Sequence, residues 1–365
     1  MQINNLKLVN FRSYSHQYFD FNPRLNIIIG KNGIGKTNLV EAIYTLAIAK
    51  SFRTNNDCLL IKKDEKMALI KAEIQDKNVN EFKLSIENTG KSVLINDTKI
   101  SRLSEYISQI NVILFNPSDL KIIKDTPSIR RKMLNIEISQ LDFSYLKYLQ
   151  DYNKVLKQRN YYLKNKDNIL NDDDFLMILT KQLINLGLII NQKRQNFITE
   201  INKYVSSLYY QITGLTSFNV KYVSEFNEKD QQDLLFLYEE SLKRDVLFKK
   251  THMGIHHDDL DFVVNNDSLK DFGSEGQQKN AIISFKLAEL EVFYHLKQTY
   301  PILIFDDLFS ELDKEKLNNI LKLLNNKVQT FITTTEIDKI NASLLNNCKI
   351  FNIRDKNVID VEEVN

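Results

Sequence analysis

The stretch Gly30-Lys31-Asn32-Gly33-Ile34-Gly35-Lys36-Thr37 follows an apolar run, Leu25–Ile29, and precedes a segment with helical character, Asn38–Ala49. It fits the pattern G-x-x-x-x-G-K-[ST] in the strand-to-helix setting that a phosphate-binding loop requires. Glycines let backbone N–H groups converge on phosphate oxygens, and the helix N-terminus adds a partial positive charge. The eight residues from Gly30 to Thr37 are therefore predicted to bind a nucleotide, ATP, through its phosphates.

Two side chains of this loop are predicted to carry chemistry. Lys36 would place an ammonium beside the β- and γ-phosphates and so take part in catalysis, and the Thr37 hydroxyl would ligate Mg²⁺. The alternative interpretation is a tight glycine turn with an incidental lysine, which the flanking strand and helix disfavour.

A second motif lies about 270 residues later, where the apolar stretch Pro301–Phe305 ends in Asp306 and Asp307. A strand that ends in carboxylates is what the Mg²⁺ side of such a site requires. Asp306 is predicted as the metal ligand and Asp307 as the catalytic general base. Taken alone, the same residues fit an ordinary buried strand followed by an acidic helix cap.

A third motif, Phe272-Gly273-Ser274-Glu275-Gly276-Gln277-Gln278, directly precedes the helical stretch Lys279–Lys297. A serine and small residues at a helix N-terminus form an anion site. Ser274, Gly276 and Gln277 are predicted to bind nucleotide. Alone, the motif fits a common helix cap equally well.

The pattern of apolar residues changes along the chain. Helical periodicity covers Ile129–Leu163 and Phe175–Ile212, with the acidic link Asn171–Asp174 between them as a turn. Stretches near both chain ends alternate or are β-branched and are predicted to be strands: Asn4–Asn10, Arg24–Ile29, Met67–Ile74, Glu81–Ile95, Pro301–Phe305, Val328–Thr333 and Lys349–Ile353. These patterns predict an α/β P-loop head assembled from both chain ends, with an inserted helical lobe.

The predicted domain limits follow from these patterns. Residues 1–120 form the N-terminal part of the head, 121–250 a mostly helical lobe, and 251–365 the C-terminal part of the head with the second and third motifs.

Composition narrows the class of protein. The chain of 365 residues has 43% hydrophobic and 26% charged residues and a net charge of +2, but 121–212 alone carries 15 Lys and Arg against 9 Asp and Glu. The surplus predicts DNA contacts through phosphates in this segment. Two cysteines and apolar runs far shorter than a membrane span of about 20 residues predict a cytoplasmic protein without a membrane segment.

Several further motifs resemble one family, the RecF family of bacterial recombination-repair ATPases, within the ATP-binding-cassette superfamily. The resemblance covers essentially the whole chain and rests, besides Gly273–Gln277 and Asp306–Asp313, on Asn10-Phe11-Arg12-Ser13-Tyr14, Lys50-Ser51-Phe52-Arg53-Thr54, Phe115-Asn116-Pro117-Ser118-Asp119-Leu120, Arg130-Arg131-Lys132-Met133-Leu134 and Gln158-Arg159-Asn160. Ser310-Glu311-Leu312-Asp313 matches the D-loop of the superfamily.

The resemblance implies a weak DNA-linked ATPase in recombinational repair and replication-fork maintenance. ATP would drive homodimerisation on gapped, single-stranded or junction DNA, slow hydrolysis would reset the protein, and a RecR-type mediator would help it load the strand-exchange recombinase. Ser274, Gly276 and Gln277 would then meet the nucleotide of the partner copy.

Some residues depart from the family pattern. Ile255 and His257 stand where the family has Pro and Arg, and Asn135 stands where it favours Asp. Thr335 takes roughly the place of the switch histidine of transporters, which predicts a weaker γ-phosphate contact. The basic run Arg130-Arg131-Lys132 fits a DNA contact, a partner contact or a solvated helix face. His256–Asp259 is a poor metal site, because four adjacent residues cannot easily turn all their side chains inward.

Other functions fit the same motifs less well. A P-loop GTPase needs N-K-x-D, and Asn165-Lys166-Asp167-Asn168 fails at its last position. A kinase has no need of the Ser274 motif. The head of a long coiled-coil chromosome protein needs hundreds of residues between its halves. A non-hydrolysing ATP-gated clamp would keep ATP binding but not the role of Asp307 as base.

Overall fold

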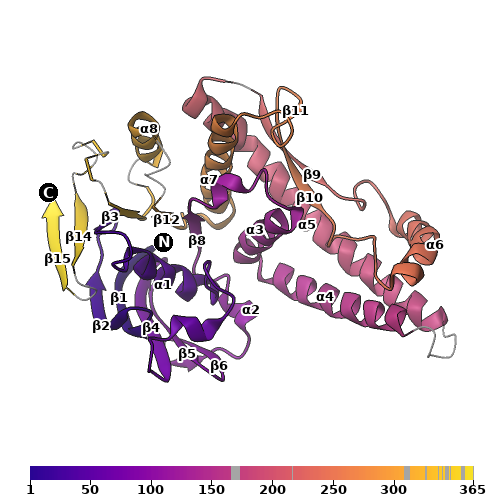
Figure 1. Cartoon of the computed structure of the whole chain (residues 1–365), viewed down its shortest axis with the longest axis horizontal. Coiled ribbons are helices and arrows are strands. Elements are labelled where there is room, and N and C mark those ends of the chain that lie inside the picture. The colour runs from indigo at the N-terminus through magenta and orange to yellow at the C-terminus, as the bar shows by residue number, and fades with distance from the viewer. Residues whose placement is uncertain are drawn as a thin grey trace. The chain divides into compact units, whose positions relative to one another are not determined.

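The computed structural model describes residues 1–165, 173–215, 217–307, 313–324, 327–335, 337–338, 340–341, 345, 347–354 and 358–364, and only the backbone of residues 120, 173, 358 and 359. The chain divides into two compact units (Figure 1). The first comprises Met1–Leu120, Gln211–Thr213 and Ile283–Asn365, and the second comprises Lys121–Tyr210 and Gly214–Ile282.

The helices alternate with strands at both chain ends and dominate the middle. The α-helices described are α1 (Lys36–Ile48), α2 (Leu103–Tyr106), α3 (Pro127–Leu141), α4 (Phe143–Lys164), α5 (Asp173–Thr213), α6 (Gln231–Phe248), α7 (Glu275–Lys297) and α8 (Lys314–Leu324). The strands described are β1 (Gln2–Phe11), β2 (Tyr14–Asp20), β3 (Leu25–Ile29), β4 (Met67–Gln75), β5 (Val79–Glu87), β6 (Gly90–Ile95), β7 (Thr98–Lys99), β8 (Val112–Phe115), β9 (Phe218–Val223), β10 (Asp259–Val264), β11 (Asp267–Ser268), β12 (Ile302–Asp306), β13 (Thr330–Thr334), β14 (Cys348–Arg354) and β15 (Val358–Val364).

The first unit contains a largely parallel sheet with the strand order β15-β14-β3-β13-β12-β8. Only β15 runs antiparallel to its neighbour. All residues of β12 and β13 are buried, as expected for central strands of a parallel sheet. The predicted fold class, an α/β P-loop head built from both chain ends, is confirmed.

A second, antiparallel sheet of the same unit has the order β2-β1-β4-β5-β6-β7. The stretch Glu81–Ile95, predicted as one strand, forms β5 and β6, which pair as a hairpin. Residues 88–89 make the turn, and the polar pair Asn88-Thr89 is the local signal for it.

The two chain ends are joined by a buried amide. The Gln329 side chain accepts a hydrogen bond from the backbone N–H of Ile3 (2.7 Å) and donates to the carbonyls of Ile3 and Asn22, both at 2.9 Å. All three contacts satisfy backbone groups of the N-terminal segment, so this one side chain from the C-terminal half fixes the start of the chain in the first unit.

The second unit holds α3, α4, α6, most of α5 and a three-stranded sheet with the order β11-β10-β9. The helical stretch predicted over Ile129–Leu163 is two helices, because Asp142 leaves helical geometry and its carboxylate caps α4 at Ser144 N (2.8 Å). Residues 251–282 belong to this compact unit, because β10 pairs with β9. The predicted domain limits, with a helical lobe over 121–250 and the C-terminal part of the head over 251–365, stay predictions.

One helix among the described residues, Asp174–Thr213, is long and apolar enough to cross a membrane. Length and composition are the only basis for this, and 44% of its most apolar window is buried inside the fold. A core helix passes the same test, so this is weak evidence for a membrane segment.

Candidate nucleotide site

The order of three neighbouring strands positions the site. In the parallel sheet β13 lies between β3 and β12, with Thr333 opposite Ile28 on one side and Asp306 on the other. The carboxyl ends of all three strands therefore meet at one edge. The Gly30–Thr37 loop follows β3 directly, so it and Asp306 lie at the same edge of the sheet.

The loop needs glycine at defined positions. Gly33 and Gly35 have φ angles of 79° and 122°, which side chains other than glycine rarely adopt. A Cβ on Gly35 would also lie 3.1 Å from Ser13 Oγ. The Tyr14 hydroxyl donates to the Gly35 carbonyl at 3.1 Å and so holds the loop where α1 begins.

Lys36 closes the loop on itself. Its Nζ donates to the carbonyls of Gly30 (2.7 Å) and Lys31 (3.1 Å), and the residue is 6% exposed. Burial lowers the pKa of the ammonium, while the nearby carboxylates Asp307 and Asp306 oppose that shift. The charge is thus held at the centre of the loop, where a phosphate would need it.

Thr37 and Asp306 form a pair across the site. The Thr37 Oγ1 donates to Asp306 Oδ1 at 3.0 Å. Burial raises the pKa of Asp306, and the hydrogen bonds from Thr333 and Thr37 act in the opposite direction. A hydroxyl and a carboxylate in contact are ligands that Mg²⁺ accepts, so this pair fits the predicted cation.

Thr333 is a site residue that the motifs did not reveal. Its hydroxyl donates to Asp306 Oδ1 (2.8 Å) and accepts from the backbone N–H of Asp307 (2.9 Å). Asp307 has a φ of 52°, a strained geometry for a residue other than glycine. Thr335, which takes roughly the place of the switch histidine of transporters, directly follows β13 and is exposed. Only the register of β13 against β12 identifies Thr333.

Two of the family motifs meet at a buried carboxylate on α1. Glu41, fully buried, accepts from Arg12 Nε (2.9 Å) and Nη2 (2.6 Å), from Arg53 Nη1 (3.2 Å) and from Ser51 Oγ (2.5 Å). Arg53 also donates to Asn38, directly after Thr37 (2.9 Å). These motifs therefore brace the helix that follows the loop.

The third motif caps α7. Ser274 Oγ accepts from the Gln277 backbone at 3.3 Å, and the Gln277 side chain accepts from the Ser274 backbone at 2.9 Å. This reciprocal pair is a capping box. Ser274, Glu275 and Gly276 are exposed, and a Cβ on Gly276 would meet nothing within 4 Å. The motif thus presents a helix N-terminus to solvent. Residues 310–312 of the predicted D-loop lie outside the described residues.

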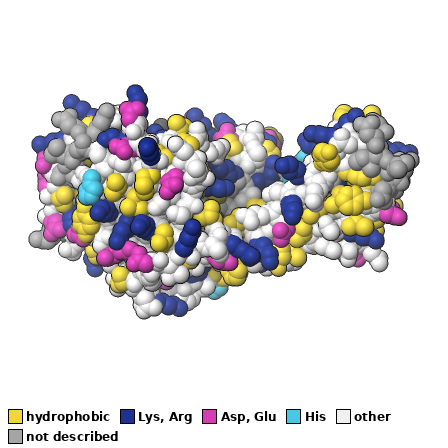
Figure 2. All heavy atoms as spheres, turned by 90° about the horizontal axis from the view of Figure 1, so that it is seen from below, with side chains coloured by type: hydrophobic (Ala, Val, Ile, Leu, Met, Phe, Trp, Pro, Cys, Tyr) yellow, Lys and Arg dark blue, Asp and Glu magenta, His cyan; other side chains and the backbone are white. Residues whose placement is uncertain are grey.

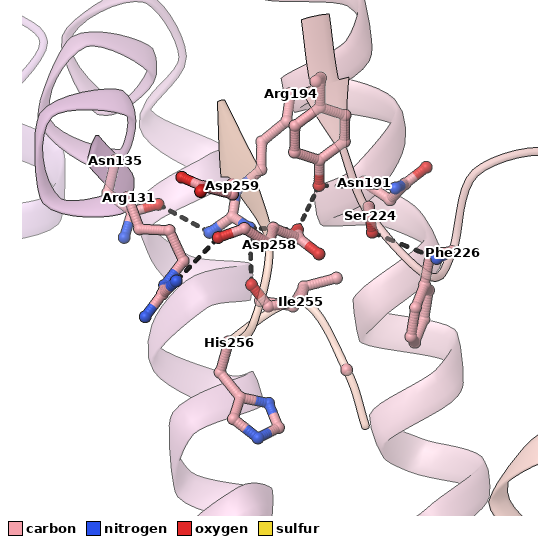
Figure 3. Close-up of polar contacts among 12 residues, drawn as sticks. Arg131, Asn135, Asn191, Arg194, Ser224, Phe226, Ile255, His256, Asp258 and Asp259 are labelled. Atoms are coloured by element: carbon pink, nitrogen blue, oxygen red, sulfur yellow. Dashed lines mark hydrogen bonds and ion pairs between the residues drawn. The ribbon is translucent and has the colours of Figure 1, made fainter. Parts of the chain in front are cut away.

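Two of the residues that depart from the family pattern, Ile255 and Asn135, contact a buried arginine in the second unit (Figure 3). Arg194 Nη1 donates to Asp258 (2.6 Å) and to the Ile255 carbonyl (2.8 Å), and its Nη2 donates to Asn135 (2.9 Å). Ile255 contributes its backbone and Asn135 a neutral oxygen, so Asp258 is the carboxylate paired with this guanidinium.

His256 belongs to the same region and is neutral. Its Nδ1 lies 2.8 Å from the Tyr152 hydroxyl, and burial, together with His257, lowers its pKa to about 4. In the described part of the chain no group of three or more His, Cys, Asp or Glu could hold a metal ion. The His256–Asp259 stretch is instead engaged in hydrogen bonds and ion pairs.

The basic surplus of 121–212 is partly internal. Arg130, Arg159 and Arg194 are each 1% exposed and pair with acidic residues that lie beyond this segment: Asp259 at 2.5 Å, Asp245 at 2.6 Å and Asp258 at 2.6 Å. The interpretation of Arg130 as a DNA contact or part of a solvated face is therefore wrong. Buried charges require such partners, so three of the fifteen positive charges are unavailable to a ligand.

Known proteins share this architecture. Residues 2–358 match the family model described as the RecF/RecN/SMC N terminal domain. The chain is 39% identical over 363 residues to a DNA replication and repair protein RecF of Ligilactobacillus salivarius, covering 97% of this chain and 96% of that one. The chain belongs to the RecF family. A Bacillus cereus RecF is also 39% identical, with 97% of both chains covered.

Solved structures agree with this assignment. The RecF-family chain matches a structure of the recombination mediator protein RecF with ATPrS in the RecFOR pathway, with a TM-score of 0.90, 28% identity and coverage of 98% of this chain and 97% of that one. It also matches a Pyrococcus furiosus Smc head domain with a TM-score of 0.55 and 16% identity, covering 99% and 96%. The second likeness concerns the fold alone.

Proposed function

We propose that this RecF-family chain is an ATP-dependent DNA-binding protein of recombinational repair and replication-fork maintenance, acting in the cytoplasm. The observation that carries the proposal is the 3.0 Å contact between Thr37 and Asp306, which joins the phosphate loop to the acidic strand end. Relatives named DNA replication and repair protein RecF, and solved RecF structures with ATP and ATPrS, support the nucleotide and the process.

The roles of the side chains follow from their positions. Backbone N–H groups of Gly30–Thr37 bind the phosphates, and the Lys36 ammonium exchanges its loop carbonyls for β- and γ-phosphate oxygens. Thr37 and Asp306 would hold Mg²⁺, which would supply positive charge beside the phosphates. Asp307 accepts the proton of the attacking water, and Thr333 keeps it beside Asp306.

The exposed cap of α7 supports a composite site. The capping box uses the Ser274 oxygen as an acceptor and leaves its proton free for a γ-phosphate. In the proposed homodimer, Ser274, Gly276 and Gln277 of one copy meet the ATP of the other, so ATP favours the dimer by binding both surfaces. Slow ATP hydrolysis then separates the two copies.

The proposed partners are DNA with gaps, single-stranded regions or junctions, and a mediator protein of the RecR type. The solved RecF structure with ATPrS is that of a recombination mediator protein in the RecFOR pathway, and this supports a mediator role for the present chain. Loading of the strand-exchange recombinase is the proposed outcome.

Three measurements on the full-length protein test the proposal. Gel filtration with and without ATP reports the dimer, phosphate release reports turnover, and anisotropy with gapped, single-stranded and duplex DNA reports binding. We expect an ATP-dependent dimer, slow turnover and DNA binding. A dimer without turnover would support the clamp instead, and a preference for GTP or phosphorylation of a small substrate would support the other P-loop classes.

A further inference from the structure

Helix α4 carries a row of exposed lysines. Lys147, Lys154 and Lys157 follow at steps of seven and three residues, which places them on one face of the helix. Other members of this face are also exposed: Phe143, Gln150, Asp151, Gln158 and Tyr161. Figure 2 shows Lys and Arg side chains on the exposed surface of the molecule, seen from below. We refer to Lys147, Lys154 and Lys157 as the α4 lysine row.

The charge of this face is compensated only in part within the helix. Asp151, the one acidic residue within α4, is exposed four residues after Lys147 and three before Lys154, so three lysines face one carboxylate. In the part of the chain that the structure describes, no ion pair involves any lysine of the α4 lysine row, whereas Arg159 of the same helix is buried against Asp245. The helix thus separates its cations: the arginine is bound within the unit, and the lysines face solvent.

We propose that the α4 lysine row binds the phosphate backbone of DNA. Ten residues of helix span about 15 Å, the axial length of four to five base pairs at ~3.4 Å each. Three cations over that length match a strand of regularly spaced phosphates. Lysines act as point charges without bidentate base recognition, so the contact is indifferent to base sequence. This inference rests on the proposed DNA-binding function and gives it a surface.

The test compares two triple variants of the full-length protein. In the first, Lys147, Lys154 and Lys157 are all replaced by Gln. In the second, three exposed lysines of the other unit, Lys63, Lys66 and Lys77, are replaced in the same way, so the net charge changes equally. Affinity for a gapped 40-mer duplex is measured by anisotropy from 50 to 300 mM NaCl with ATPγS, and ATPγS binding serves as the control for folding.

The α4 variant is expected to lose at least about tenfold in DNA affinity at 100 mM salt, and the slope of log affinity against log salt should flatten by about 2–3. The matched variant should keep the wild-type slope, and both should bind ATPγS normally. An unchanged slope in the α4 variant, or equal losses in both variants, overturns the inference. Absence of DNA binding by the wild type would instead overturn the proposed function.

Discussion

Thr333 donates its hydroxyl proton to Asp306 over 2.8 Å, from one central strand of the parallel sheet to the next. The same oxygen accepts the backbone N–H of Asp307 at 2.9 Å. One hydroxyl therefore fixes both acidic residues, the metal-side carboxylate through its oxygen and the proposed base through its backbone.

Thr333→Val tests whether Thr333 positions the two acidic residues for hydrolysis or contributes to ATP binding. Valine keeps the shape but removes the hydroxyl, so the hydrogen bonds to Asp306 and to the Asp307 backbone N–H are lost. The cost is about 1–3 kcal/mol of unfolding free energy. We expect kcat for ATP to fall more than about tenfold, as far as loss of general-base geometry allows, with little change in KM. Thr333→Ser is the control and should restore turnover. Equal effects on kcat and KM, or no rescue by serine, would argue for a purely structural role.

The Mg²⁺ dependence of ATPγS binding tests the role of Thr333 without relying on ATP turnover. The Mg²⁺ concentration that half-saturates ATPγS binding should rise in Thr333→Val, because Asp306 loses one of its two hydroxyl donors and its orientation. Isothermal titration at graded Mg²⁺ measures this, and identical Mg²⁺ dependence in both proteins would contradict it.

Lys36→Ala should weaken ATP binding at least about tenfold, since charge-assisted hydrogen bonds contribute roughly 1.5–3 kcal/mol. Because Lys36 also bonds two loop carbonyls, a modest loss of thermal stability is expected as well. Fluorescence titration with a labelled ATP analogue measures the affinity, with Lys66→Ala as the exposed control. Wild-type affinity in a folded Lys36→Ala protein would remove this residue from the site.

Asp307→Asn should retain ATP binding and reduce hydrolysis by about 10²–10⁴-fold, the usual contribution of a general base. The wild-type rate should itself be slow, because an aspartate reaches less far than the glutamate common in fast cassette ATPases. Single-turnover measurements of phosphate release decide both points. Turnover typical of motor ATPases, or full activity in the variant, is incompatible with this role.

Ser274→Arg should leave ATP binding to the monomer intact while it abolishes ATP-induced dimers and hydrolysis. The residue is exposed at the start of α7, so the change places a bulky cation on the surface and not in a core. Mixing this variant with Lys36→Ala should restore one working site per heterodimer. Normal dimerisation of Ser274→Arg, seen by gel filtration, would rule out the composite site.

His256 predicts a pH dependence of stability. Its pKa is lowered to about 4 in the folded protein, whereas the unfolded value is near 6.5, so the unfolded chain binds the proton more readily. The stability that neutral His256 contributes is therefore fully present above pH 6.5 and is lost as the pH falls toward 4. At pH 5 the free energy of unfolding should be lower by about 2 kcal/mol. Urea unfolding of wild type and His256→Asn at pH 7 and pH 5 measures the difference. An equal loss in both proteins would exclude His256 as its source.

Local sequence determined the loop, the acidic strand end and the class of fold. Gly33 and Gly35 carry the positive φ angles that the phosphate-loop pattern implies, and a short apolar strand leads into Asp306. These features depend on residues adjacent in the chain, where backbone geometry and side-chain polarity act directly. Pattern alone was sufficient for them.

Contacts between distant residues were decided only by the tertiary structure. The basic surplus of 121–212, which was predicted to contact DNA, includes Arg130, Arg159 and Arg194, yet each of these is paired with a carboxylate 64 to 129 positions away. Thr333 carries no motif and joins the site only through the register of β13 and β12. Burial and strand register depend on how elements pack, which local sequence does not show. A buried charge or hydroxyl needs a hydrogen-bond or ion-pair partner, and that partner determines its role.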